Sequence, residues 1–144
     1  MDGEISELSA EALVRAGGWD PRYARALLVA QDADHALALI DGNGDGAELE
    51  LEHWTRDTGS GWHGSASSGF GALDAMPAAQ SWNAGDVVAA VGKSEPDAEV
   101  SIRYGGRSYR RQAGQSGVWG FIHAADSARA DELPVATVVA PREN

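Results

Sequence analysis

Cysteine is absent from the 144-residue chain, which excludes disulfides, thiolate metal sites and cysteine nucleophiles. Lysine occurs only at Lys93, beside ten arginines, a bias typical of GC-rich bacterial genomes. Basic residues number 11 against 22 acidic ones, so the formal net charge is -11. Because nucleic acids and anionic membrane surfaces are bound through clustered Lys and Arg, neither is expected as a partner.

Long apolar runs are also missing. No segment approaches the roughly 20 apolar residues that a membrane span requires. The first residues, MDGEISELS, carry acids where a secretory signal carries positive charge. We therefore expect a soluble, cytoplasmic protein that forms one domain over residues 1–144, a length that can bury a sizeable core.

Catalytic motifs are lacking as well. The chain has no Gly-x-Ser-x-Gly elbow, phosphate loop or dinucleotide fingerprint. Serines lie near His63, but at no spacing that would pair a nucleophile with an oriented base. We assign no catalytic residue and no cofactor, and the balance favours a protein without enzymatic activity.

What is present is a strand pattern. Residues 6–16 predict a short helix that Ser6 or Ser9 caps and Gly17 ends. Residues 20–31 fit either a helix or a strand, and we favour the strand. From about 22 to 140, period-two alternation recurs between turn signals, apart from an irregular stretch at 70–85. We predict a mainly β fold, an antiparallel β-sandwich or barrel-like meander of eight or nine strands.

Residues 41–52, DGNGDGAELELE, match a helix-loop-helix calcium loop letter for letter. The following residues form no apolar stripe at helical period, whereas Leu49 and Leu51 alternate as in a strand. Extended geometry would put Glu52 roughly 20 Å from Asp45, too far to close the site. We therefore predict a β-hairpin turn in which Leu39 pairs with Leu49. A weak calcium site remains an alternative, with ligands from Asp41, Asn43, Asp45 and Glu48.

This register has a consequence for the histidines, because it sets His35 opposite His53. The mirrored text HWTRDTGSGWH predicts a second hairpin in which Trp54 meets Trp62 and His53 meets His63. Three imidazoles in one row across neighbouring strands are a possible zinc site with an open coordination position. The alternative is that they are hydrogen-bonded edge residues, since a one-residue slip in either register destroys the row.

Two further groups are candidates for binding. In the predicted register, Trp54 and Trp62 lie on the face opposite the leucines, either as an exposed pair that stacks on a sugar or protein, or beneath a second layer. Gly105 and Gly106 predict a two-residue hairpin turn. The resulting ribbon concentrates four arginines, which either dock an acidic partner or are balanced by nearby acids; they are Arg103, Arg107, Arg110 and Arg111.

The sequence thus favours a non-enzymatic interaction or ligand-binding module that takes a protein partner or a small ligand. One alternative is a zinc-dependent hydrolase built on His35, His53 and His63. Another is a carbohydrate-binding β-sandwich with a weak calcium loop. Exposed edge strands make a homodimer plausible.

Overall fold

The computed structural model describes residues 6–57, 61–84, 86–124 and 132–139. Within these residues the protein is 54% strand, with one short α-helix and ten strands in three antiparallel sheets, none of them closed into a barrel. The predicted antiparallel β fold with a short N-terminal helix is confirmed. The chain divides into two compact units, residues 1–76 and 77–144. The expectation of a single domain stays a prediction.

The first unit is one helix on a four-stranded sheet. The strands lie in the order β1-β2-β3-β4, each antiparallel to its neighbour. Residues 20–31, which fitted either a helix or a strand in the sequence, form a strand from Arg25 onward, as favoured. The elements are α1 (Ala10–Ala16), β1 (Arg25–Asp32), β2 (His35–Asp41), β3 (Leu49–Arg56), β4 (Trp62–Gly71) and the 3-10 turn η1 (Leu73–Ala75).

Helix α1 is bounded by the residues that its sequence suggests, although it begins four residues later than predicted. The Ser9 hydroxyl accepts a hydrogen bond from the Ala12 amide at 3.0 Å, which satisfies one of the free N–H groups of the first turn. At the other end Gly18 takes a φ of 81°, a conformation that glycine adopts at little cost. The Trp19 amide then donates to the Val14 carbonyl at 3.0 Å, so the chain reverses directly after the helix.

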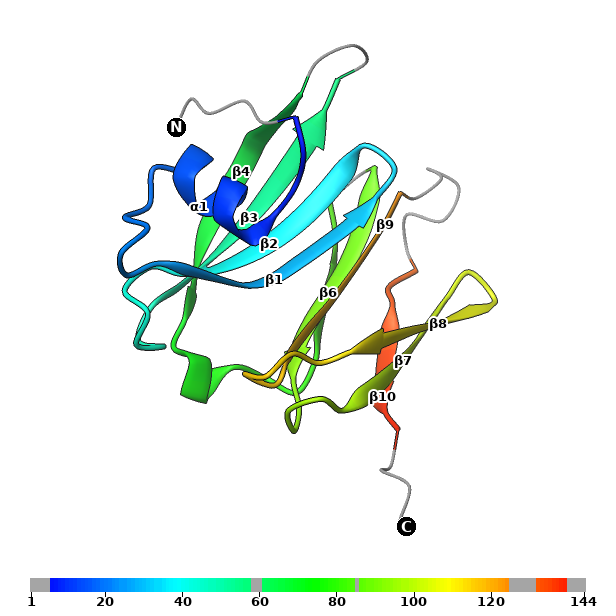
Figure 1. Ribbon diagram of the computed structural model, residues 1–144. Coiled ribbons are helices and arrows are strands. Elements are labelled where there is room, and N and C mark those ends of the chain that lie inside the picture. The colour runs from blue at the N-terminus through cyan, green and yellow to red at the C-terminus, as the bar shows by residue number, and fades with distance from the viewer. Residues whose placement is uncertain (1–5, 58–60, 85, 125–131, 140–144) are drawn as a thin grey trace. The chain divides into compact units, whose positions relative to one another are not determined.

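The core of the first unit lies between α1 and one face of the sheet (Figure 1). Leu13 and Val14 are the buried residues of the helix. Small residues of β2 leave room for the helix to approach the sheet, while two indoles fill the space over β3 and β4. The sheet residues of this cluster include Ala36, Ala38, Ile40, Trp54 and Trp62.

Strands β2 and β3 form the predicted hairpin. Both oxygens of the buried Asp41 carboxylate accept backbone N–H groups of the loop, from Gly44 at 3.1 Å and Gly46 at 2.8 Å. Each of these glycines has a φ of 76°. The register differs from the prediction by two residues, because Leu39 pairs with Leu51 instead of Leu49.

The second unit consists of two three-stranded sheets with the orders β10-β7-β8 and β5-β6-β9. Its core cluster draws on β6, β7 and β9, with Ile102, Trp119 and Phe121 among the buried residues. One strand, β5, lies within residues 70–85, where none was expected. Its four residues are too few for alternation to be visible. The strands are β5 (Gln80–Asn83), β6 (Val87–Lys93), β7 (Glu99–Tyr104), β8 (Arg107–Gln112), β9 (Val118–Ala124) and β10 (Val135–Val138).

Within the described residues, no helix has the length and apolar character needed to cross a membrane.

Candidate functional site

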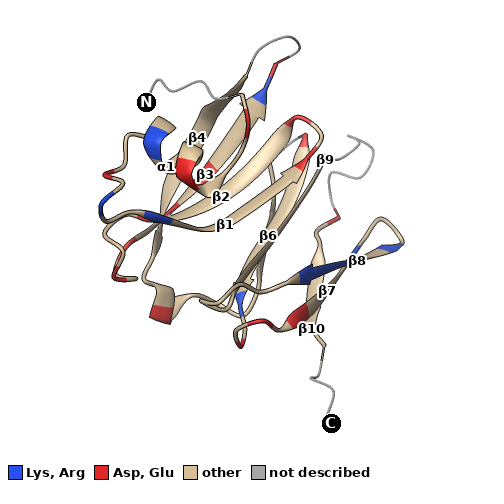
Figure 2. Ribbon diagram, viewed as in Figure 1, with Lys and Arg blue, Asp and Glu red and all other residues tan. Residues whose placement is uncertain are grey.

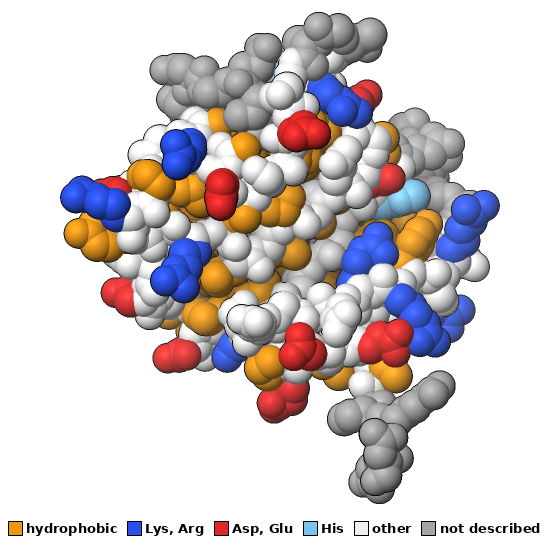
Figure 3. All heavy atoms as spheres, viewed as in Figure 1, with side chains coloured by type: hydrophobic (Ala, Val, Ile, Leu, Met, Phe, Trp, Pro, Cys, Tyr) orange, Lys and Arg blue, Asp and Glu red, His pale blue; other side chains and the backbone are white. Residues whose placement is uncertain are grey.

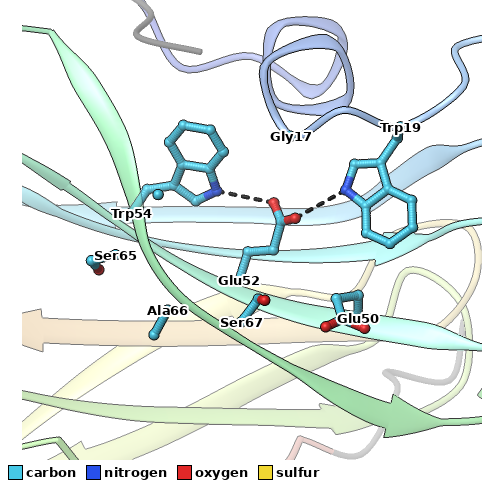
Figure 4. A pocket seen from close by; sticks show the side chains of 9 residues that line it. Gly17, Trp19, Glu50, Glu52, Trp54, Ser65, Ala66 and Ser67 are labelled. Carbon is cyan, nitrogen blue, oxygen red and sulfur yellow. Dashed lines mark hydrogen bonds between the residues drawn. The ribbon is translucent and has the colours of Figure 1, made fainter. Parts of the chain in front are cut away.

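A pocket of about 450 Å³ opens in the first unit, between the end of α1 and the strands β3 and β4. This volume lies within the range of small-ligand sites, roughly 300–1,000 Å³. Trp19 forms one side of the pocket, and alternate residues of β3 form its floor (Figure 4). The lining residues are Gly17, Trp19, Glu50, Glu52, Trp54, Gly64, Ser65, Ala66 and Ser67.

Trp19 is held in place by the glycines around it. A Cβ on Gly17 would lie 2.8 Å from Cδ1 of the indole, and a Cβ on Gly42 would lie 2.8 Å from Cζ3. Real Cβ atoms do not approach so closely, so both positions need glycine for the indole to lie between them. Gly17 has a φ of -76°, which any residue adopts, and its requirement is therefore steric.

Glu52 is the central polar group of the pocket. Its Oε2 accepts a hydrogen bond from Trp19 Nε1 at 2.9 Å, and its Oε1 accepts one from Trp54 Nε1 at 3.0 Å (Figure 4). The side chain is only 6% exposed. A buried carboxylate is costly unless hydrogen bonds or a counter-charge compensate it, and two N–H donors satisfy two of its four lone-pair directions.

The charge of the pocket is negative. Glu50 precedes Glu52 by two residues on β3, so both side chains lie on the same face of the sheet. The nine described lining residues include these two carboxylates and no Lys or Arg. The pocket therefore offers negative charge and aromatic surface together.

The side of the pocket formed by β4 has little side-chain bulk. Ser67 pairs with Glu52, and Gly69 pairs with Glu50. Neither a serine nor a glycine rises far enough above the sheet to separate the carboxylates from the edge of β4. The pocket is consequently open toward that edge.

The local sequence pattern does not reveal this site. Period-two alternation placed Glu50 and Glu52 on a water-facing side of β3, whereas Glu52 is buried. The available signal was the spacing of Glu52 and Trp54, since residues two apart share a face. A layer that covers Trp54 therefore packs on the same face of β3 as Glu52.

Of the two alternatives for the indole pair, the structure has burial beneath a second layer. Trp54 and Trp62 are each 1% exposed, because α1 supplies the second layer over their face of the sheet. Trp54 borders the pocket through its N–H bond to Glu52. Trp62 does not line the pocket, and the guanidinium of Arg56 lies 4.7 Å from the centre of its ring. The two side chains therefore present no exposed platform for a sugar.

The three-histidine row is not assembled, because both registers differ from the prediction. His35 lies opposite Thr55, and His63 of β4 lies opposite the same threonine on its other side. His35 and His53 do stack, with ring centroids 5.6 Å apart, as diagonal neighbours. His63 lies beside Asp57 instead, at 3.6 Å from Nε2 to Oδ2. In the described residues, no group of three or more His, Asp or Glu is placed to hold a metal ion.

The carboxylates among the four proposed calcium ligands, Asp41, Asp45 and Glu48, do not form a metal-binding group in the described residues either. Each Asp41 oxygen accepts one loop amide, and Asp45 accepts a hydrogen bond from the Ala47 amide at 3.0 Å. These bonds fix the hairpin turn. Asn43 and Glu48 lie in the same loop.

The arginine ribbon has the predicted register. Tyr104 pairs with Arg107, and Arg103 pairs with Ser108. Arg110 forms an ion pair with Glu99 at 2.7 Å, and Arg111 lies over Phe121, 5.3 Å from the ring centre. Basic residues follow one another along the β7–β8 hairpin in Figure 2, and basic side chains lie on that part of the surface in Figure 3. Arg110 is thus balanced by a neighbouring acid, and the ribbon as a docking surface stays a prediction.

Comparison of the chain with protein-family models, with curated proteins and with solved structures finds no significant match.

Proposed function

We propose that the chain is a non-enzymatic ligand-binding module, and that the pocket between Trp19, Glu52 and Trp54 binds an organic cation. The observation that carries the proposal is the buried Glu52 carboxylate held between two indole N–H groups. The indoles fix its orientation and leave two lone-pair directions for the N–H groups of a ligand.

The chemistry of the lining favours a positively charged ligand. Two carboxylates and no basic side chain line the described pocket, and Trp19 adds aromatic surface. Ammonium and guanidinium groups are attracted both to carboxylates and to indole faces, and partial burial strengthens both attractions. An anionic ligand would instead meet two like charges.

Titration with small cations tests the proposal. We expect saturable binding of n-propylammonium or n-propylguanidinium, followed through the indole N–H resonances of Trp19 and Trp54. The uncharged n-propanol should not bind. Added salt should weaken binding because charge contributes to it. Glu52→Gln should abolish binding, whereas Glu48→Gln removes an exposed carboxylate outside the pocket and should leave it unchanged.

The proposal is wrong if neither cation shifts those resonances. It is also wrong if both cations bind the Glu52→Gln variant as tightly as the original protein, provided that the variant keeps its strand content by circular dichroism.

A further inference from the structure

Strand β4 is an edge of its sheet with unusual composition. It follows β3 at the end of the order β1-β2-β3-β4 and has no further strand beyond it among the described residues (Figure 1). Natural proteins protect such edges with charged residues or proline, because an open edge pairs with other chains. Residues 64–69 of β4 have the sequence GSASSG, which contains neither a charged residue nor a proline. The edge strand β8 of the second unit, by contrast, carries three arginines.

The part of β4 that is free of bulges is short. Register shifts lie at Ser65 and Phe70, and between them Ala66 to Gly69 pair without interruption with His53 to Glu50. Residues 65–69 are all exposed. This leaves a regular, accessible edge of four residues, which suits a short extended peptide better than a long one.

The same four residues adjoin the pocket. Ser67 lies opposite Glu52 on β3, so a fifth-strand residue opposite Ser67 would direct its side chain over the same face. Two strand spacings, roughly 10 Å, separate the fifth strand from β3. The combined reach of Glu52 and an extended Lys or Arg side chain covers that distance, and nothing bulkier than Ser67 lies between.

We propose that β4 accepts an extended basic peptide as a fifth strand along Ala66 to Gly69, with one Lys or Arg side chain in the Glu52 pocket. This inference rests on the proposed function and names the ligand of that same site. Backbone hydrogen bonds along the edge would supply affinity, and the pocket would select the basic side chain.

Charge complementarity favours a basic peptide over a second copy of the chain. Each copy carries a formal charge of -11, and β4 itself contains no Lys or Arg to enter a partner's pocket. Pairing of two β4 edges would also bring two acidic pockets toward one another, and that arrangement is unfavourable.

Binding of short synthetic peptides to the full chain tests the inference. The probe is the acetylated, amidated peptide Val-Thr-Lys-Thr-Val, compared with the same peptide carrying Gln at the centre. We expect the Lys peptide to bind at least ten-fold more tightly than both the Gln peptide and n-propylammonium. Glu52→Gln should remove the preference for Lys, and Glu48→Gln should retain it.

Backbone N-methylation of the peptide reports strand pairing without altering the protein. Alternate N–H groups of an edge-bound strand point toward the sheet. Methylation at those positions should weaken binding at least ten-fold, and methylation at the intervening ones less than two-fold. Amide resonances of Ala66 to Gly69 should shift on binding.

Failure of this inference is distinguishable from failure of the proposed function. If n-propylammonium binds through Glu52 but the Lys peptide binds no more tightly, or N-methylation shows no alternation, the fifth strand is wrong and the cation pocket stands. A concentration-dependent dimer that buries β4 and excludes the peptide would also overturn the inference. Loss of cation binding itself would overturn both.

Discussion

Replacement of Glu52 by glutamine tests how the centre of the pocket is held together. The change is nearly isosteric, but an amide offers one carbonyl oxygen where the carboxylate offers two acceptors. One indole N–H would keep its acceptor and the other would face an amide N–H₂. Trp54 is the more deeply buried of the two donors, so its loss of a partner would be the more costly.

The expected loss in the free energy of unfolding is about 1–3 kcal/mol, the usual cost of a buried donor left without an acceptor. Easier burial of a neutral amide offsets part of this loss, since a charged group is the more costly to remove from water. Guanidinium unfolding at neutral pH, followed by circular dichroism, measures the change through the midpoint when the slope is unaltered. Glu48→Gln, at an exposed loop position, should stay within about 0.5 kcal/mol of the original protein.

A double-mutant cycle isolates the hydrogen bond from other effects. Trp54→Phe removes the buried donor, so Glu52→Gln should cost less in that background, with a coupling of about 1 kcal/mol or more. Additivity of the two changes within about 0.5 kcal/mol would refute the argument, because contacting partners that share a hydrogen bond do not behave independently.

Three further changes probe the surrounding structure. Gly17→Ala places a Cβ 2.8 Å from the indole of Trp19, so the free energy of unfolding measured with denaturant should fall by about 1–3 kcal/mol. As a control, the new Cβ of Gly69→Ala meets open space, and the free energy of unfolding should fall by less than about 1 kcal/mol. Asp41→Ala deprives two loop amides of their acceptor, so the free energy of unfolding should fall by about 1–3 kcal/mol in the same assay. Millimolar calcium should leave the melting temperature of the original protein unchanged. The side chain of Arg22, and then its backbone amide, lower the pKa of Asp20 through hydrogen bonds. The contribution of this pair to stability is present at a pH above the ordinary carboxyl pKa, and it is lost as the pH falls through the lowered pKa of Asp20. A carboxyl titration by NMR should show a higher pKa of Asp20 in Arg22→Ala than in the original protein. An unchanged pKa would contradict the assignment.

Strand register could be predicted from the sequence where a short turn with a fixed number of residues joins the two strands. The Gly105-Gly106 turn has two residues, so its register could be predicted pair by pair, and Tyr104 does meet Arg107. The loop between β2 and β3 is longer, and Leu39 shifted by two positions to Leu51. A shift of two keeps every side chain on the same side of the sheet. The grouping of side chains by face was therefore right, whereas the opposed residues, and the exposure assigned to the face that carries Glu52, were wrong.

The pocket required information that no local pattern contains. Alternation assigns Glu52 and Trp54 to one face of β3, but whether that face meets water depends on α1 and on Trp19, which is 33 residues away from its hydrogen-bond partner Glu52. The reversal at Gly17-Gly18 brings that indole back to the sheet. The helix and Trp19 cover the face that carries both Trp54 and Glu52, and a buried carboxylate requires donors. The sequence offers few neutral side-chain donors as bulky and rigid as an indole, and two of its five tryptophans are used here. One acidic residue thus explains part of the high tryptophan content, because these two indoles fill the space around Glu52 and donate hydrogen bonds to its carboxylate. The residues of β4 beside the pocket are small, so no large side chain covers the rest of the Glu52 carboxylate from that side.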